Sequence, residues 1–511
     1  MISKEIIKKP WFSAFVSGTA TGIATHLFGL VNVLHNFDDI AVQPAGYGTG
    51  LRSGRWLLTI LGDLVKNTFG GYNLPYVNGI LFILLVGASA AFVSATLKLE
   101  KRRWAIAVGA VFAVFPCTTA TLFYRYTVVY YGIALLLSVL AVYFLDRYKF
   151  GLPLSIVCTA FSLGIYQAYV PVTVTLFVIR LIQKTLKKED SVGRLVLSGL
   201  YDCLSLVLGL GVYYVILWIC LRANNMSLGS YQGVDSMGKI SLSALPGLIR
   251  RAYVSFLKIP VKDYCSLSQT GLIRLCYLLL GLFSIGLTGY ALVTRVKKPL
   301  HCAFVVAMGL ILPVAFNFIV IMCPDSRIYT LMVYSFALIP CVPIVMLDGL
   351  APSPKKWQSS CEKMIAKTVG ATLAVLIISY GYLANANYMF LYYSNRQIEN
   401  YMASIVTQVR MTEGFTSDKE WGFVGTPEDP LLKSNWRRLS FFHGNAEPER
   451  LLTAYSRNNW LKTYCGYDVP LASDEKLAEI ALDPRFEQMP CWPDNGSIAV
   501  LDDMVVIKFS D

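Results

Sequence analysis

Residues 74–97 read LPYVNGILFILLVGASAAFVSATL, an apolar stretch without a single charged side chain. About 20 apolar residues in a helix are enough to cross the hydrocarbon core of a bilayer. The stretch ends at a basic run, Lys98-Leu99-Glu100-Lys101-Arg102-Arg103, which is typical of the cytoplasmic end of a spanning helix. These residues predict a membrane span, and we expect its neighbours along the chain to follow the same plan.

The composition of the whole chain supports this expectation. Of 511 residues, 55% are hydrophobic and only 15% are charged, whereas about a quarter of the residues of a soluble domain are charged. Counting apolar runs of spanning length predicts a mostly α polytopic membrane protein with eleven transmembrane helices. The runs lie near residues 12–34, 74–97, 104–123, 127–146, 151–167, 169–183, 195–221, 271–294, 300–322, 328–348 and 368–391.

The positions of Lys and Arg predict the orientation. With the N-terminus in the cytoplasm, every inner segment carries positive charge, as the positive-inside rule requires. A turn at Gln167-Ala168-Tyr169 must then separate two short helices within residues 151–183. The same count places the loops at 35–73, 124–126, 222–270 and 323–327 outside, together with the end of the chain. Because the cations lie in short runs between spans, they indicate lipid headgroups as partners and no nucleic acid.

The charge balance changes sign along the chain. Residues 1–392 hold 33 Lys and Arg against 14 Asp and Glu, and residues 393–511 hold 12 against 18. We therefore predict a transmembrane domain over 1–392 and a soluble extracytoplasmic α+β domain over 393–511. Two stretches of the outer loops, 51–69 and 240–258, have amphipathic helical spacing and are expected to lie in the membrane interface. Surface-lying linker helices without chemistry are the alternative for both.

Asp38 and Asp39 are the first candidates for catalysis. They directly follow the first predicted span, in Leu34-His35-Asn36-Phe37-Asp38-Asp39-Ile40. A partly desolvated carboxylate has a raised pKa and can take a proton from a sugar hydroxyl. We expect one of the two to act as the base and the other to position it. The alternative is a pair of solvated acids on a turn.

Arginines on the same predicted face are candidates for binding a phosphate. They are Arg52, Arg55, Arg125 and Arg327. Tyr124 and Tyr126 flank Arg125, and Tyr329 follows Arg327. A guanidinium can bind a phosphate through two hydrogen bonds, which suits this role. The alternatives are arginines that reach lipid phosphates, and a pair between Arg327 and Asp325.

Four short motifs, taken in their order and sidedness, resemble the glucosyl transferase II family. These are bacterial and phage serotype-converting glucosyltransferases, polytopic enzymes of the GT-C fold. The motifs are Asn36-Phe37-Asp38-Asp39, Ser53-Gly54-Arg55-Trp56, Pro75-Tyr76-Val77-Asn78-Gly79 and Ile165-Tyr166-Gln167-Ala168-Tyr169. The resemblance extends over residues 10–390. The chain departs from the family at the Arg125 loop, where members often carry an acidic residue soon after the third span.

The resemblance implies an inverting transfer of a sugar, with glucose on undecaprenyl phosphate as the expected donor. The acceptor would be a hydroxyl of a lipid-linked or cell-surface glycan at the outer face of the bacterial cytoplasmic membrane, and Asp38 or Asp39 would be the base. An upstream polyprenyl-phosphate glucosyltransferase and a flippase would supply the donor. No cofactor is expected. Paired acids are able to hold a divalent metal ion, but the sequence shows no dedicated set of metal ligands. The competing hypothesis is a flippase or transporter of lipid-linked sugars.

The remaining expectations concern substrate contacts and the end of the chain. Residues 393–511 contain four tryptophans, Trp421, Trp436, Trp460 and Trp492, which either stack on glycan or fill a core. Cys465 and Cys491 would form a disulfide only in an oxidising compartment. The side chains expected to contact substrate are Tyr124, Tyr126, Trp56, Gln167 and Tyr329.

Overall fold

The computed structural model describes residues 4–42, 50–70, 73–187, 190–230, 237, 241–349, 356–427 and 442–510. These form two compact units. The first unit comprises Met1–Val31 and Ala45–Asn385, and the second comprises Asn32–Pro44 and Ala386–Asp511. The segment that contains the two candidate acids therefore belongs to the second unit, together with the end of the chain, while the predicted domain boundary at 392/393 falls within one long helix.

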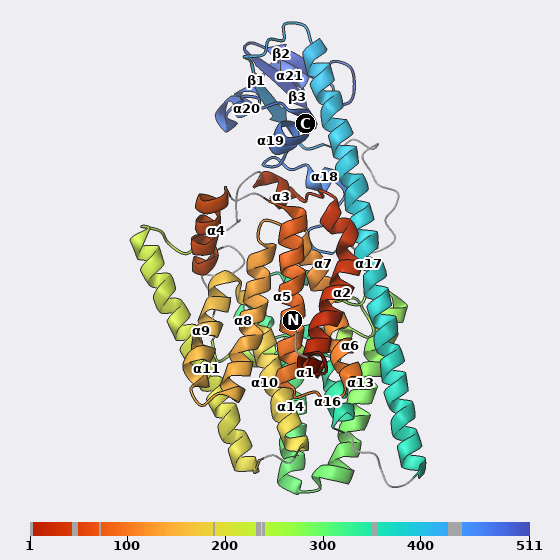
Figure 1. Ribbon diagram of the computed structural model, residues 1–511. Helices are drawn as coiled ribbons and strands as arrows, with labels where there is room; N and C mark the ends of the chain where they lie inside the picture. The colour runs from red at the N-terminus through yellow and green to blue at the C-terminus, as the bar shows by residue number, and fades with distance from the viewer. Residues whose placement is uncertain are drawn as a thin grey trace. The chain divides into compact units, whose positions relative to one another are not determined.

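The first unit is a bundle of helices (Figure 1). Its α-helices are α1 (Lys4–Ile7), α2 (Pro10–Val31), α4 (Trp56–Phe69), α5 (Pro75–Thr96), α6 (Arg102–Val114), α7 (Pro116–Leu122), α8 (Val128–Arg147), α9 (Gly151–Ile165), α10 (Val170–Leu186), α11 (Val192–Ala223), α12 (Leu245–Lys258), α13 (Gly271–Ala291), α14 (Pro299–Phe316), α15 (Ile319–Met322), α16 (Cys341–Asp348) and the first part of α17 (Lys356–Met411). Shorter helical turns are η1 (Leu51–Ser53), η2 (Gln167–Tyr169), η4 (Leu292–Val296), η5 (Thr330–Met332) and η6 (Tyr334–Leu338).

Small residues let the first helices pack closely. Helix α2 packs against both α5 and α6, and α8 packs against both α5 and α9. At Gly109, an added Cβ would lie 2.2 Å from the carbonyl oxygen of Ala14 and 2.8 Å from the amide nitrogen of Gly18. Only a residue without a side chain fits this crossing of α2 and α6, which is the kind of close approach that membrane helices use.

Eight described helices are long and apolar enough to cross a membrane, and the count is nine if one bent pair is a single span. The eight overlap the predicted spans at 12–34, 74–97, 127–146, 169–183, 195–221, 271–294, 300–322 and 368–391, although α14 ends at Phe316, six residues before the predicted end. The length and composition of these helices are consistent with a polytopic membrane protein, but the count of eleven is not confirmed.

The other three predicted spans differ from single long helices. Residues 104–123 form α6 and α7, which meet at an angle of 41°. Pro116 begins α7, and its ring and missing N–H interrupt the helical hydrogen bonds. Helix α9 has only 15 residues and ends at the extended Tyr166, so residues 151–183 do form two separate helices. Residues 328–348 contain η5, η6 and α16 in place of one helix.

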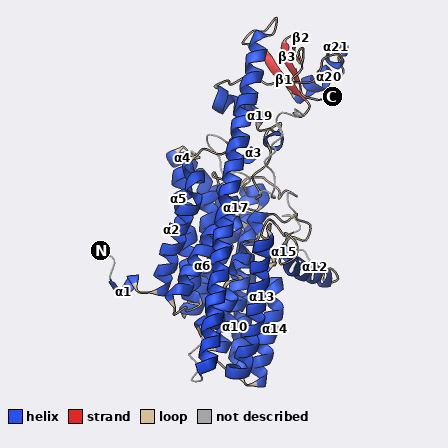
Figure 2. Cartoon of the chain, turned by 90° about the vertical axis from the view of Figure 1, so that its right-hand side faces the viewer, coloured by secondary structure: helices blue, strands red, loops and turns tan. Residues whose placement is uncertain are grey.

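Both predicted amphipathic stretches contain helices. Residues 51–69 form η1 and α4, and α12 occupies most of 240–258. Figure 2 shows α12 at the edge of its unit, where it packs against α14 and α15. Its exposed side chains include Ile249, Val254 and Leu257. An exposed apolar stripe of this kind fits a helix that lies in a membrane interface.

The second unit combines helices with a small sheet. It contains α3 (Phe37–Ala41), the last part of α17, α18 (Pro448–Leu451), α19 (Arg457–Trp460), the turn η8 (Leu461–Cys465), α20 (Asp474–Ile480), α21 (Pro484–Glu487) and strands β1 (Glu420–Val424), β2 (Ile498–Leu501) and β3 (Met504–Lys508). The strand order is β1-β3-β2, with β1 parallel and β2 antiparallel to the central β3. All five residues of β3 are buried, so this strand forms the centre of the sheet.

Candidate active site

The two candidate acids lie at the start of α3 in the second unit. Asn36 caps this helix: its side-chain oxygen accepts a hydrogen bond from the backbone N–H of Asp39 at 2.6 Å. Asparagine is among the preferred residues at this position because its side chain satisfies a backbone donor of the first turn. The cap fixes the direction in which the chain enters α3, and with it the positions of Asp38 and Asp39.

Asp39 is fully buried and hydrogen-bonded to histidine. The Nδ1 atom of His35 lies 2.7 Å from Asp39 Oδ2, and both side chains are enclosed. The aromatic rings of Trp460 and Tyr464 pack edge-on against the His35 ring, with centroids 6.0 and 5.7 Å away. A buried carboxylate is tolerated when it is hydrogen-bonded in this way. Because it is enclosed, Asp39 is placed to hold its surroundings in position and has little access to a substrate.

Asn395 of α17 holds the backbone of His35. Its Oδ1 accepts a hydrogen bond from His35 N at 2.7 Å, and its Nδ2 donates to His35 O at 2.9 Å. The two residues are separated by 360 positions in the sequence. The paired hydrogen bonds fasten the residues just before α3 to α17 within the second unit.

Asp38 has a different environment from its neighbour. Its side chain is half-buried, and its Oδ1 accepts a hydrogen bond from the Tyr455 hydroxyl at 2.6 Å. Burial raises the pKa of Asp38 above its usual value, the Tyr455 hydrogen bond lowers it, and the nearby charge of Asp39 raises it, with a net upward direction. A carboxylate with a raised pKa that remains accessible is a suitable general base.

The two acids were predictable from sequence, but the residues that surround them were not. Tyr455 contacts Asp38 from 417 positions away, and Asn395 and Trp460 are similarly distant. Nothing in the local pattern of residues 34–40 points to these partners. Of the residues singled out in the sequence, only the tryptophans of 393–511 include one of these partners, because Trp460 packs on His35.

The candidate phosphate-binding arginines all belong to the first unit, where Arg55 is the most elaborately held. Gly54, just before it, has a φ of +73°, a left-handed conformation that favours glycine. The side chain of Gln167 donates to Ser53 O at 2.9 Å, and the Tyr213 hydroxyl donates to Gly54 O at 3.0 Å. Gln167, predicted to contact substrate, thus fixes the turn that presents Arg55.

Two tyrosines hold the Arg55 guanidinium. Its Nη1 donates to the Tyr131 hydroxyl at 3.2 Å, and the group lies 5.0 Å from the centre of the Tyr166 ring. The rings of Tyr131 and Tyr166 are stacked, with centroids 4.4 Å apart. Stacking and cation–π contact limit the rotamers of a half-buried arginine, so its charge is held in one place.

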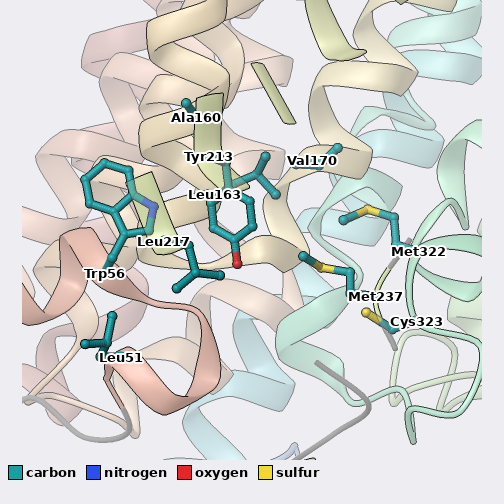
Figure 3. Close-up of a cluster of buried hydrophobic side chains, with 10 residues drawn as sticks. All are labelled: Leu51, Trp56, Ala160, Leu163, Val170, Tyr213, Leu217, Met237, Met322 and Cys323. Atoms are coloured by element: carbon teal, nitrogen blue, oxygen red, sulfur yellow. The ribbon is translucent and has the colours of Figure 1, made fainter. Parts of the chain in front are cut away.

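Trp56 belongs to the core in this structure. It is 3% exposed and lies in a cluster with Leu163, Tyr213 and Leu217 (Figure 3). Met237, Met322 and Cys323 gather on the other side of Tyr213 from Trp56. An added Cβ at Gly164 would lie 2.6 Å from the Trp56 ring, so the indole packs directly onto α9.

Arg125 lies in the short connection between α7 and α8. It is 3% exposed, and its carbonyl oxygen accepts a hydrogen bond from Asn78 Nδ2 at 3.2 Å. Tyr124 is buried and Tyr126 half-buried, and their rings meet edge to face at 6.3 Å. The burial of Arg125 makes it less accessible to a ligand than Arg55.

Arg52 and Arg327 are exposed. The Arg327 guanidinium lies 5.6 Å from the centre of the Tyr329 ring, which is itself half-buried. The carbonyl oxygen of Arg52 accepts a hydrogen bond from Gly229 N at 2.8 Å. Both side chains remain accessible from solvent, which is compatible either with a ligand or with lipid phosphates.

Two of the four sequence motifs meet in the structure, and a third contacts the Arg125 loop. The motif at 53–56 contacts the one at 165–169 through Gln167 and Tyr166, and the motif at 75–79 contacts the Arg125 loop through Asn78. Tyr131 and Tyr213 are the supporting residues that sequence reasoning missed. Each is a tyrosine inside an apolar helix, where burying a hydroxyl costs free energy unless it is hydrogen-bonded. The presence of a polar group at such a position was the feature of the sequence that could have identified them.

The tryptophans near the end of the chain are placed mainly in the core. Trp421 and Trp460 are 3% and 0% exposed, Trp492 is half-buried, and Trp436 lies outside the described residues. Cys465 and Cys491 are free thiols, so the disulfide does not form in this structure. Among the described residues, no group of three or more His, Cys, Asp or Glu is arranged to hold a metal ion.

A comparison with protein families finds a match over more than half of the chain. The family model described as Glucosyl transferase GtrII matches residues 27–340, which include both candidate acids and the four arginines. Comparisons with curated proteins and with solved structures find no match.

Proposed function

Because the chain belongs to the glucosyl transferase GtrII family, we propose that it moves a glucosyl unit from a polyprenyl phosphate to a glycan hydroxyl. The family and the eight apolar helices identify a glucosyltransferase associated with a membrane. The proposal adds the donor, the outer face of the bacterial cytoplasmic membrane as the place of reaction, and the residues that carry the chemistry.

The observation that carries this proposal is the difference in burial and hydrogen bonding between Asp38 and Asp39. Asp39 is enclosed and bound to His35, whereas Asp38 is half-buried and bound only at its edge by the Tyr455 hydroxyl. Asp38 is therefore the proposed base, and Asp39 is a positioning residue. The raised pKa of Asp38 brings its proton affinity closer to that needed near neutral pH.

The proposed reaction is a single displacement. Asp38 takes the proton of the acceptor hydroxyl as the oxygen attacks the anomeric carbon. The bond between that carbon and the donor phosphate oxygen breaks, and the electron pair leaves with the phosphate. Attack from the face opposite the leaving group inverts the anomeric centre, and the proton ends on the Asp38 carboxylate.

Arg55 is the first candidate to stabilise the leaving phosphate. Its guanidinium is half-buried and held by Tyr131 and Tyr166, whereas Arg125 is nearly enclosed and Arg52 and Arg327 are exposed. A positive charge fixed in advance stabilises developing negative charge without the cost of reorganisation. Arg125, Arg327 and Arg52 remain candidates for further phosphate contacts, and Tyr124, Tyr126 and Tyr329 for substrate contacts.

The proposal can be tested by transfer of radiolabelled glucose from undecaprenyl-phosphate glucose in membranes that contain the full chain. We expect transfer by the wild type to glycan of the bacterium that carries the protein, and loss of transfer in Asp38→Asn. The exposed Asp503→Asn variant is the matched control. If labelled donor crosses the membrane but no glycan is labelled, the flippase hypothesis replaces this one.

A further inference from the structure

A groove in the second unit lies beside the residues that hold Asp39. Its volume is about 800 Å³, and its walls are one face of α17 and the turn η8. The α17 wall includes Arg396, Asn400, Thr407 and Arg410, and the opposite wall includes Tyr464, Cys465 and Tyr467. Sites for small ligands have volumes of about 300–1,000 Å³, so the groove is large enough to be one.

The groove is continuous with the surroundings of the acids. Tyr464, which lines it, stacks on Trp460 with centroids 5.2 Å apart and meets the His35 ring edge-on at 5.7 Å. Arg396, at one end, follows Asn395 directly, and Asn395 holds the His35 backbone. One end of the groove therefore borders the residues that position Asp39.

The walls present polar groups in hydrogen-bonded pairs. Arg396 Nη1 lies 2.6 Å from Glu399 Oε2, and Arg410 Nη1 donates to the Tyr467 hydroxyl at 2.9 Å. From Arg396 to Arg410, α17 rises by about 21 Å, which is longer than a single sugar ring. A lipid chain along this length would leave the charged groups facing apolar atoms, which is unfavourable. A hydroxyl-rich chain can exchange hydrogen bonds with each pair.

From these contacts we infer that the groove binds the acceptor glycan, as an oligosaccharide whose reacting end lies toward His35. The inference rests on the proposed function, because it takes the acceptor to be a glycan. Tyrosine rings offer an apolar face and a hydroxyl, and the Arg396–Glu399 pair offers donors and acceptors side by side. The lining holds two arginines and one glutamate, so its net charge is positive, which suits a neutral or anionic glycan. Recognition by tyrosines and arginines of the groove replaces stacking on tryptophans, since Trp421 and Trp460 are buried.

Cys465 provides a native reporter for occupancy of the groove. It lies in the lining, while Cys491 is half-exposed in the same unit and is not part of that lining. The purified full chain in detergent is treated with a maleimide, with and without polysaccharide extracted from the bacterium that carries it. Labelling at each thiol is measured by peptide mass spectrometry. At a glycan concentration ten times that of half-saturation, labelling of Cys465 should slow about tenfold while that of Cys491 is unchanged.

A variant distinguishes polysaccharide bound in the groove from polysaccharide that shields Cys465 non-specifically. Arg410→Gln should raise the polysaccharide concentration needed for half-protection of Cys465 about tenfold, because it removes charged hydrogen bonds to the ligand. Arg485→Gln, at an exposed arginine that pairs with Asp483 and Asp502, should leave it unchanged. Equal protection in Arg410→Gln and the wild type would contradict the inference.

The outcomes distinguish this inference from the proposed function. If Cys465 labels equally fast with and without polysaccharide, the groove is not the acceptor site, even when glucose transfer proceeds and requires Asp38. If Cys465 is protected but Asp38→Asn retains full transfer, the groove binds glycan and the proposed base is wrong.

Discussion

Replacing Asn395 by alanine should release the segment that carries both acids. The variant removes the two hydrogen bonds between Asn395 and the backbone of His35, at 2.7 and 2.9 Å. Asn395 and His35 are 2% and 1% exposed, so water is not available to replace the lost partners. Leaving a buried polar group unsatisfied costs about 1–3 kcal/mol, which gives about 2–6 kcal/mol for the pair.

Hydrogen exchange measures this loss where it occurs. At the lower limit of about 2 kcal/mol, the open population of the segment rises about 30-fold. Amide exchange over residues 35–41 should accelerate by at least about this factor in the purified full chain, while exchange in α5 and α8 stays unchanged. Glucose transfer should fall as well, because the position of Asp38 depends on this segment.

Asn459→Ala is the matched control for this variant. Asn459 donates to Ala41 O in the same segment, but at 3.4 Å, so the bond is weak. We expect exchange over 35–41 to change by less than about fivefold in this variant. Unchanged exchange in Asn395→Ala, or an equal effect of the two variants, would refute the role assigned to Asn395.

Three further predictions follow from contacts at Tyr455, Arg55 and Arg180. Tyr455→Phe removes the hydrogen bond that lowers the pKa of Asp38, so the carboxyl stays protonated to higher pH and the acidic limb of the transfer rate should move to higher pH. Arg55→Gln should reduce the rate of transfer about 100-fold at saturating donor, because a fixed positive charge at the leaving phosphate is lost. Arg180→Ala should lower the free energy of unfolding of the first unit by about 3–5 kcal/mol, since the buried guanidinium bonds both oxygens of Asp202 at 2.6 Å and Asp146 at 3.0 Å. The three measurements are a pH–rate profile, steady-state transfer kinetics and denaturant unfolding in detergent.

Each of these has a surface control. Tyr393→Phe, at an exposed tyrosine of α17, should leave the pH profile unchanged. Arg222→Gln, at an exposed arginine beside Trp218, should leave transfer unchanged. Arg194→Ala breaks an exposed pair with Asp190 at 3.9 Å, so its effect should stay below about 1 kcal/mol. The role of Tyr455 would be contradicted by an unchanged acidic limb in Tyr455→Phe. The role of Arg55 would be contradicted by undiminished transfer in Arg55→Gln, and that of Arg180 by an unchanged free energy of unfolding in Arg180→Ala.

The helices were predictable from sequence because length and hydrophobicity decide whether a segment can cross a membrane. The run at 74–97 predicted α5, and the turn at Gln167-Ala168-Tyr169 predicted the break between α9 and α10. The bend between α6 and α7 was not predicted, because a proline such as Pro116 inside a continuous apolar run does not change its hydropathy. The helical turns within 328–348 were missed because the apolar run there is continuous and hydropathy does not distinguish short turns from one helix.

The candidate site was predictable only in its local parts. Asp38 and Asp39 are conspicuous in sequence because acids at the end of a span are costly. Which of them is enclosed depends on His35, Asn395 and Tyr455, and the last two are hundreds of positions away. No periodicity or spacing encodes such contacts. The grouping of residues 32–44 with the end of the chain is likewise a tertiary feature.

The most direct test of the account compares Asp38→Asn with Asp39→Asn, both as folded full-length proteins. The measurement is the pH–rate profile of glucose transfer from undecaprenyl-phosphate glucose at saturating donor and acceptor. Removal of a general base costs about 100- to 10,000-fold, and we expect this loss and a flattened acidic limb in Asp38→Asn. Asp39→Asn should keep a pH-dependent, reduced rate, because His35 retains a hydrogen-bonding partner of the same shape. Full transfer by Asp38→Asn, or loss of the acidic limb in Asp39→Asn alone, would contradict the assignment of Asp38 as the base.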